Sequence, residues 1–235
     1  MKGDNMPGFI LHLLHGKFLL ESGEFSFNET EKMQFRAGLM IPDAYKKDYL
    51  RNEKSHFFPE RTRPEFVRVP DLDMFSEKYA EYFHDPYVAG YAAHLYADRF
   101  FFPDYLSEYI SYADKNGVSA VSRDDITDVV IKKSGLKVSR DRFFSSEYFY
   151  GDYSRLNHFL INKYDLKNIR YTETSDIIDE ADSKDLRKVI SDLERYLTET
   201  PEDTELKVLT CDSVENEFRK YTEGFVHWYK DICSK

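Results

Sequence analysis

Five residues between positions 12 and 98 carry the side chains of a metal site: His12, Asp43, His56, His94 and Asp98. Neutral imidazole nitrogens suit zinc, and a carboxylate can bridge two ions. His94 and Asp98 are four residues apart, so a helix would place both side chains on one face, within reach of a common ion. The set predicts a site for two adjacent zinc ions, and iron or manganese stays open as the bound metal.

The sequence blocks that contain these residues resemble one protein family and follow each other in the family's order. The blocks are residues 6–16, 38–44, 55–57 and 90–98. They are similar to blocks of the bacterial zinc-dependent phospholipase C family, whose members share their fold with fungal single-strand nucleases. The resemblance covers about residues 6–105.

This resemblance implies both the ligands and the fold. It implies that one zinc is bound by Asp43, His56, His94 and Asp98, and that Asp98 shares a second zinc with His12. It also implies an all-α fold, a multi-helix bundle like that of phospholipase C and the nucleases.

Two departures from the family pattern concern a third zinc. The family places a histidine before the proline that follows the helix pair, whereas this chain has Phe102 before Pro103. A histidine and a carboxylate one helical turn apart would complete the third site, but the nearest pair is His158 and Asn162, which ends in a neutral amide. We expect the third site to be absent or very weak. His15 is a further candidate ligand for the second ion.

The resemblance and the ligand set predict a metal-dependent hydrolase of phosphoesters, similar to phospholipase C. A water activated between two metal ions would attack phosphorus. Asp43 is the candidate catalytic residue, because a carboxylate beside this water could orient it or accept its proton. The expected partner is a small-molecule phosphoester or a phospholipid headgroup.

Three alternatives stay open. The first is a non-catalytic, metal-containing binding or regulatory protein of the same fold. The second is an HD-type phosphohydrolase, whose His-Asp dipeptide would be His84-Asp85; Pro86 places that dipeptide at a helix start, which leaves His84 a candidate near the site. The third makes the histidines ordinary core and helix-end residues.

Composition limits the remaining function classes. The 235 residues, 41% of them hydrophobic, suffice for one large domain. The formal net charge of −10 would repel phosphate backbones, so no nucleic-acid partner is expected. No apolar run approaches a membrane span, and no signal peptide is recognisable. With two cysteines only, we expect a cytoplasmic protein; the sequence leaves its oligomeric state unknown.

Helical patterns run through most of the chain. They cover residues 9–21, 28–39, 71–83, 86–102, 104–114, 122–133, 140–149, 153–164, 183–197 and 213–232. Residues 51–70 are expected to form a loop that carries His56. Residues 169–172 and 206–209 have strand-like composition and predict a small two-stranded β element.

The helix with the last two candidate ligands is expected at the centre of the fold. Asp85 and Pro86 give it a start signal, with proline in the first turn. Gly90, Ala92 and Ala93 are small and would allow neighbouring helices to approach closely.

Three segments are expected within what is one domain overall. Residues 1–166 form a helical metal-binding core, residues 167–212 a cap or insertion, and residues 213–235 a C-terminal helix that packs on the core.

Overall fold

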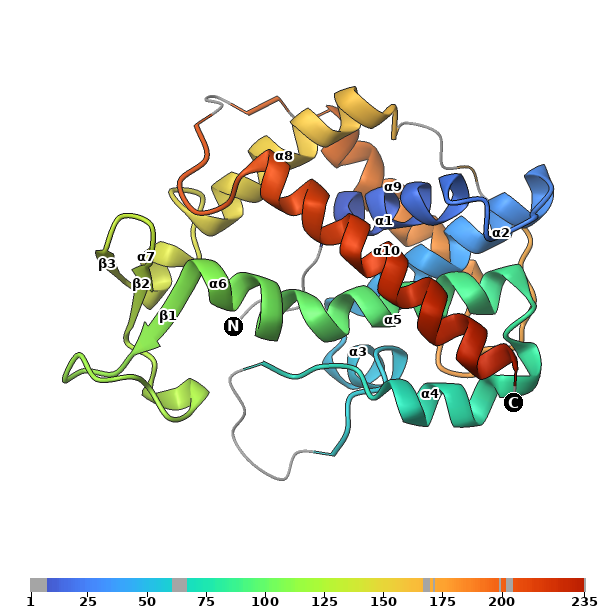
Figure 1. Cartoon of the computed structure of the whole chain (residues 1–235), viewed down its shortest axis with the longest axis horizontal. Helices are drawn as coiled ribbons and strands as arrows, with labels where there is room; N and C mark the ends of the chain where they lie inside the picture. Colours follow the sequence, from blue (N-terminus) through green and yellow to red (C-terminus); the bar gives the residue numbers. More distant parts are fainter. Residues whose placement is uncertain are drawn as a thin grey trace.

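The chain folds into a mainly helical molecule, as the sequence predicts, with helix α5 (Pro86–Phe100) at its centre (Figure 1). Most residues of α5 are buried, and it contacts α1, α2, α4 and α10. The computed structural model describes residues 8–60, 67–166, 170, 172–198, 200–201 and 205–234.

The helices of the described part have the following bounds, with 3-10 and π segments labelled η. In chain order they are α1 (Phe9–Glu21), α2 (Glu29–Met40), η1 (Ile41–Tyr45), α3 (Tyr49–Ser55), α4 (Leu72–Tyr79), η2 (Ala80–Tyr82), α5 (Pro86–Phe100), η3 (Phe101–Leu106), α6 (Ser107–Tyr109), η4 (Arg123–Asp125), α7 (Arg140–Phe143), α8 (Phe149–Tyr164), η5 (Ser183–Asp185), α9 (Leu186–Thr198) and α10 (Cys211–Cys233).

Local signals set the starts of the two helices that frame the site. Asn28 caps α2 and forms a capping box with Glu31. Asp85 caps α5 by accepting the backbone N–H groups of Tyr87 and Val88, and Pro86 occupies the first turn. Both starts agree with the sequence prediction.

Two glycines bring α2 and α5 into backbone contact. A Cβ atom on Gly38 would lie 1.9 Å from the carbonyl oxygen of Tyr87, and one on Gly90 would lie 1.9 Å from the carbonyl oxygen of Phe35. Only glycine fits at either position, because a side-chain carbon would overlap main-chain atoms. The close approach expected at Gly90 is therefore present, and it fixes the spacing of the two helices that lead to the site.

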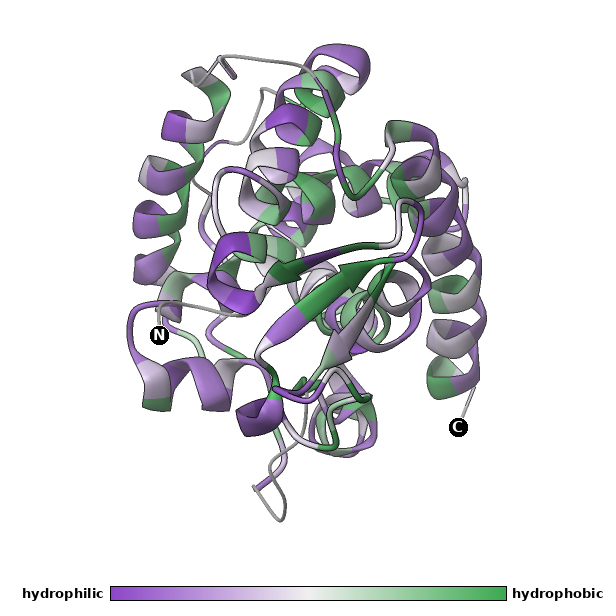
Figure 2. Cartoon of the chain, turned by 90° about the vertical axis from the view of Figure 1, so that its left-hand side faces the viewer, coloured by the Kyte–Doolittle hydropathy of each residue, from purple (hydrophilic) through white to green (hydrophobic). Residues whose placement is uncertain are grey.

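A three-stranded antiparallel sheet lies at one end of the molecule (Figures 1 and 2). Its strands are β1 (Ile110–Ala113), β2 (Asp128–Ile131) and β3 (Leu136–Ser139), in the order β1-β2-β3. Val129 pairs with Val138, and both side chains are buried in the core, as is that of Ile131. One face of the sheet thus belongs to the core.

The sequence predicts helices over residues 104–114 and 122–133, and this prediction is wrong for the residues that form β1 and β2. Burial in β2 alternates residue by residue, with Val129 and Ile131 buried and Val130 half-buried. This period of two suits a strand, and β-branched side chains pack well on a pleated surface. The run is too short for its period to distinguish a strand from a helix in the sequence alone.

The two-stranded β element expected at residues 169–172 and 206–209 is also wrong. The backbone N–H groups of Lys207, Val208 and Leu209 donate to the buried Asp152 carboxylate instead of to a partner strand. Arg170 and Thr172 are in no strand, and the other residues of 169–172 lie outside the described part of the chain. Asp152 therefore accepts the backbone hydrogen bonds that the carbonyl groups of a partner strand would otherwise accept.

Smaller corrections concern the ends of helices. The expected loop over residues 51–70 begins as a helix, because α3 extends to Ser55. The central helix changes to the π-helix η3 after Phe100, before Pro103 is reached. The helix expected over residues 140–149 is shorter, since α7 ends at Phe143 and α8 already begins at Phe149.

The helices after the sheet cover the core. α9 buries Leu186, Val189 and Leu193, which lie on one helical face, and it contacts η1, α2 and α8. α10 contacts α1, α5 and α8. In the described residues, no helix combines the length and apolar character that crossing a membrane requires.

Candidate metal centre

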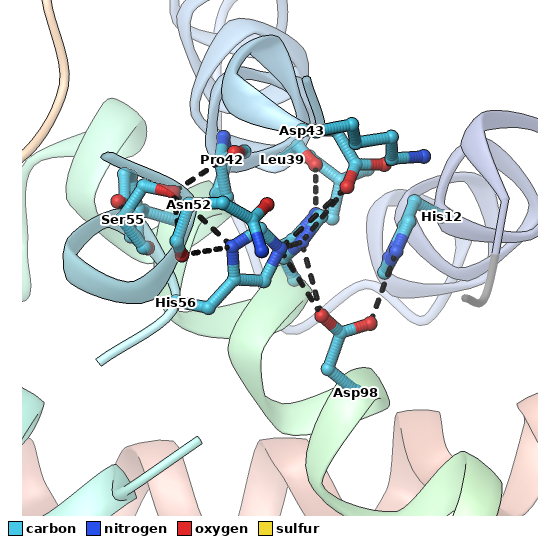
Figure 3. Close-up of polar contacts among 11 residues, drawn as sticks. His12, Leu39, Pro42, Asp43, Asn52, Ser55, His56 and Asp98 are labelled. Atoms are coloured by element: carbon cyan, nitrogen blue, oxygen red, sulfur yellow. Dashed lines mark hydrogen bonds and ion pairs between the residues drawn. The ribbon is translucent and has the colours of Figure 1, made fainter. Parts of the chain in front are cut away.

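The five candidate ligands come together in one buried cluster, although they stem from different elements (Figure 3). His12 lies on α1, Asp43 on η1, His56 at the end of α3, and His94 and Asp98 on α5. Their side chains are at most 8% exposed. Two overlapping groups have ligand atoms within 4.8 Å of one another: His12, Asp43 and His94, and His56, His94 and Asp98.

Four of these side chains direct ligand atoms at one another. His94 Nε2 lies 3.3 Å from His56 Nε2, 3.3 Å from Asp98 Oδ2 and 4.0 Å from Asp43 Oδ1. His56 Nε2 lies 3.5 Å from Asp98 Oδ2 and 3.6 Å from Asp43 Oδ1. Ligands bound to one zinc ion at their usual bond lengths are separated by about 3.4 Å. These separations are therefore close to those of side chains that share a metal ion.

Asp98 extends the cluster toward His12. Its Oδ1 lies 3.3 Å from His12 Nε2, while its Oδ2 faces His56 and His94. The His12 ring stacks on the His94 ring with 3.8 Å between centroids. The two oxygens of one carboxylate therefore face two sets of imidazoles, the arrangement of a carboxylate that bridges two ions.

Main-chain carbonyl groups set the orientation of two of the rings. His94 Nδ1 donates to the carbonyl oxygen of Leu39 (2.8 Å), and His56 Nδ1 donates to that of Asn52 (3.0 Å). Because a carbonyl oxygen only accepts, each Nδ1 carries the hydrogen and each neutral ring presents an Nε2 lone pair to the cluster. This is the tautomer that binds metals.

Hydrogen bonds of Ser55 hold the elements of the site together. Its hydroxyl donates to the carbonyl oxygen of Pro42 (3.0 Å) and lies 3.1 Å from His56 Nδ1. Its own carbonyl oxygen accepts the hydroxyl of Tyr91, which stands on α5. α3, η1 and α5 are thus joined beside the residues that carry the ligands.

The carboxylates and imidazoles change each other's pKa values. Burial alone would raise the pKa values of Asp43 and Asp98, but Lys46 and His56 around the first, and His94 and His12 around the second, hold both well below the usual range. Both carboxylates are therefore ionised at neutral pH and available as ligands.

The pKa values of two imidazoles in the cluster shift in opposite directions. Burial favours a lower pKa for His94, but the neighbouring carboxylates Asp98 and Asp43 raise it above its usual value. Burial and the charge of His94 lower the pKa of His12 to about 4, so His12 is neutral at pH 7. Neither buried nitrogen of His12 forms a well-aligned hydrogen bond, and Nε2 lies 3.3 Å from Asp98 Oδ1, close enough for both atoms to bind one cation.

The additional candidates do not join the two groups. His15 is fully buried, and its ring packs edge-on against Phe218 and Phe225. His84 is exposed just before α5. His158 lies half-buried on α8, where its Nε2 is 3.2 Å from Asn162 Nδ2.

One charged residue at the cluster, Lys46, was not among the site residues predicted from the sequence. Lys46 follows Asp43 by three residues, and its Nζ lies 2.7 Å from Asp43 Oδ2. Its side chain is 25% exposed, whereas that of Asp43 is 2% exposed. Lys46 therefore marks the side on which the cluster meets solvent. The three-residue spacing of Asp43 and Lys46 is visible in the sequence, but it indicates a role at the site only once Asp43 is known to be buried.

Comparisons of the chain with family models, with curated proteins and with solved structures find no match.

Proposed function

We propose that this protein is a metal-dependent hydrolase of phosphoesters, similar to phospholipase C, with zinc as its metal. The observation that supports the proposal best is the convergence of two buried, ionised carboxylates and three imidazoles in one small volume. Buried negative charge needs a compensating cation, which protonated imidazole supplies in part and a bound metal ion would supply more fully.

The residues are suited to two ions. Asp43, His56, His94 and Asp98 would hold the first, and Asp98 and His12 would contribute to the second. Bound zinc ions supply a water that is deprotonated near neutral pH and polarise a phosphoryl group. The side chains of this chain hold the ligand atoms in place and keep bulk water from the buried side.

Asp43 acts mainly as a ligand and as an orienting group in this proposal. Its Oδ1 faces the imidazoles and its Oδ2 faces Lys46. Because both oxygens are engaged and its pKa is lowered, Asp43 is a poor proton acceptor. In the net reaction, water would release one proton to solvent, its oxygen would form the new bond to phosphorus as the bond to the leaving oxygen breaks, and the leaving oxygen would take up a proton from solvent.

Turnover of model substrates tests the proposal. Zinc-loaded protein is incubated with a phosphomonoester, a phosphodiester and a phosphocholine ester, with and without chelator. We expect chelator-sensitive release of the leaving group from at least one of them, and a loss of at least about 100-fold in His94→Ala. His84→Ala is the control, because His84 is exposed and outside the cluster.

A protein that binds zinc but turns over none of these substrates would support the alternative of a non-catalytic metal-containing binding protein. We propose a small-molecule phosphoester as the partner and the cytoplasm as the location. The free cysteines Cys211 and Cys233 are compatible with a reducing compartment.

A further inference from the structure

Lys46 is fixed beside the cluster by two contacts. Its Nζ lies 2.7 Å from Asp43 Oδ2 and 4.1 Å from the centroid of the Phe9 ring. The carboxylate and the ring face hold the ammonium group by charge and by a cation–π interaction. Phe9 is itself held, since its ring meets that of Tyr196 on α9 at 5.9 Å, edge to face. The position of the charge is therefore set by the fold.

The two carboxylate oxygens of Asp43 face different neighbours. Oδ1 faces His56 and His94, the side on which a metal would bind, while Oδ2 faces Lys46. An ammonium group has three N–H donors, and one of them suffices for Asp43. A second side of the ammonium group faces the Phe9 ring, and one donor remains for a ligand that reaches the cluster from the partly exposed side.

The shape and charge of phosphate esters determine what this donor can bind. A phosphomonoester at neutral pH is largely a dianion with three oxygens that carry no carbon, whereas a phosphodiester is a monoanion with two. If two such oxygens contact two metal ions, a monoester still has one charged oxygen free. In a diester, that position is taken by an ester oxygen, which carries no full charge and is a weak acceptor.

We propose that Lys46 binds the third charged oxygen of a phosphomonoester and thereby makes the site selective for monoesters over diesters. The proposal rests on the proposed phosphoester hydrolase function and specifies its substrate class. Lys46 touches the substrate in this arrangement and is not itself a metal ligand.

The test measures binding as well as turnover. Zinc content is determined first, and inorganic phosphate and dimethyl phosphate are then titrated calorimetrically into the zinc-loaded protein. In Lys46→Gln, we expect phosphate to bind about 10- to 100-fold more weakly, the usual effect of losing one hydrogen bond to a charged group. The affinity for dimethyl phosphate should change less than about 2-fold, and Lys46→Arg should restore much of the affinity for phosphate.

Lys17→Gln is the matched control. Lys17 stands on α1, its Nζ lies 2.7 Å from Glu21 Oε1, and its side chain is 33% exposed. Lys17→Gln therefore removes a lysine of similar exposure from an ion pair of the same length, but its partner Glu21 is 57% exposed and belongs to neither ligand group. Phosphate affinity should not change in this variant. With substrates, Lys46→Gln should lower kcat/KM for a phosphomonoester about 10-fold or more and leave that for a diester within about 2-fold.

The outcomes separate this proposal from the proposed function. If zinc and phosphate bind but Lys46→Gln has no effect, or weakens both anions equally, the role of Lys46 is wrong while the hydrolase proposal stands. A loss of zinc from Lys46→Gln would make Lys46 a support of Asp43 and would also overturn the proposal. If the wild-type protein binds no zinc, both proposals fail.

Discussion

His56 Nε2 and His94 Nε2 lie 3.3 Å apart, while the Nδ1 atom of each ring donates to a main-chain carbonyl group. Both Nε2 atoms therefore face the cluster, where the carboxylate of Asp98 adds a negative charge. Without a metal, a proton on His94 Nε2 can bridge to these acceptors, which agrees with the raised pKa of His94. The fold thus directs two imidazole nitrogens and a carboxylate at one position that a cation can occupy.

Zinc binding should follow from this arrangement, with two ions per chain. At about 100 times its dissociation constant, each ion stabilises the folded state by about 2.7 kcal/mol. For a chain of this size, that corresponds to a rise in melting temperature of about 5–10 °C per ion. Elemental analysis after dialysis and melting curves with zinc or with chelator measure both effects.

His94→Ala should abolish binding of the first ion and the stabilisation that this ion brings, because His94 Nε2 lies beside both His56 and Asp98. His158→Ala is the control: it removes a histidine of another helix that is in neither group. Equal zinc content in His94→Ala and wild type would contradict the proposed site.

Ser55 should affect zinc affinity without binding the ion. Its hydroxyl contacts the carbonyl oxygen of Pro42 and the His56 ring. Ser55→Ala should weaken zinc binding about 10- to 100-fold, the usual effect of removing a group that orients a ligand. Ser76→Ala is matched, because Ser76 is also buried but its hydroxyl bonds only to Asp73 of its own helix. Competition with a chromogenic chelator gives both affinities, and similar losses in the two variants would show a general effect of packing.

Gly90→Ala should destabilise the fold and impair the site together. The added Cβ atom would lie 1.9 Å from the carbonyl oxygen of Phe35, so α2 and α5 must separate. We expect a loss of about 3 kcal/mol in the free energy of unfolding, measured by urea denaturation. Gly224→Ala should cost less, because its Cβ would meet only the hydroxyl end of the Tyr96 side chain at 2.4 Å. A larger loss in Gly224→Ala than in Gly90→Ala would contradict this account of the contact.

His15 should make the stability of the metal-free protein depend on pH. Burial and the charge of His12 lower its pKa from 6.5 to about 3. Below pH 6.5, the unfolded chain binds a proton at this residue that the folded chain excludes. The contribution of the neutral His15 to the free energy of unfolding is therefore fully present above pH 6.5 and is lost as the pH falls toward 3.

The variant His15→Leu isolates this contribution. Between pH 8 and pH 5, the wild type should lose about 2 kcal/mol more of its free energy of unfolding than the variant does. Denaturation curves at several pH values measure the difference. Parallel losses in both proteins would contradict the buried, neutral state of His15.

The sequence was informative where a local signal was sufficient. Asn28 and Asp85 are helix caps, and their chemistry acts within three residues. The four-residue step from His94 to Asp98 needs only a helix to align the two side chains. The convergence of Asp43 and His56 with His94 and Asp98 could be expected through the family resemblance alone, since no local signal brings η1 and α3 against α5.

The sequence misled where distant groups decide the structure. Val129 faces the core because β2 pairs with β1 and β3. The turn at Gly135 is a local signal for the β2–β3 hairpin, but the pairing of β2 with β1 joins segments that are more than ten residues apart. Lys207 to Leu209 look like a strand, but their N–H groups bond to Asp152, which is more than fifty residues away. Lys46 looks like any surface lysine until the burial of Asp43 is known.

The close packing of α2 against α5 at Gly38 and Gly90 also bears on which ion the cluster accepts. Gly38 meets the main chain at Tyr87 and Gly90 meets it at Phe35, so the two helices cannot approach further, and the carbonyl groups that bind His56 and His94 restrict the rotation of these rings. Calcium requires six to eight oxygen atoms at about 2.3–2.6 Å. A cluster of three imidazoles and two carboxylates offers too few oxygen atoms for it, so discrimination between metals here begins in the packing of two helices.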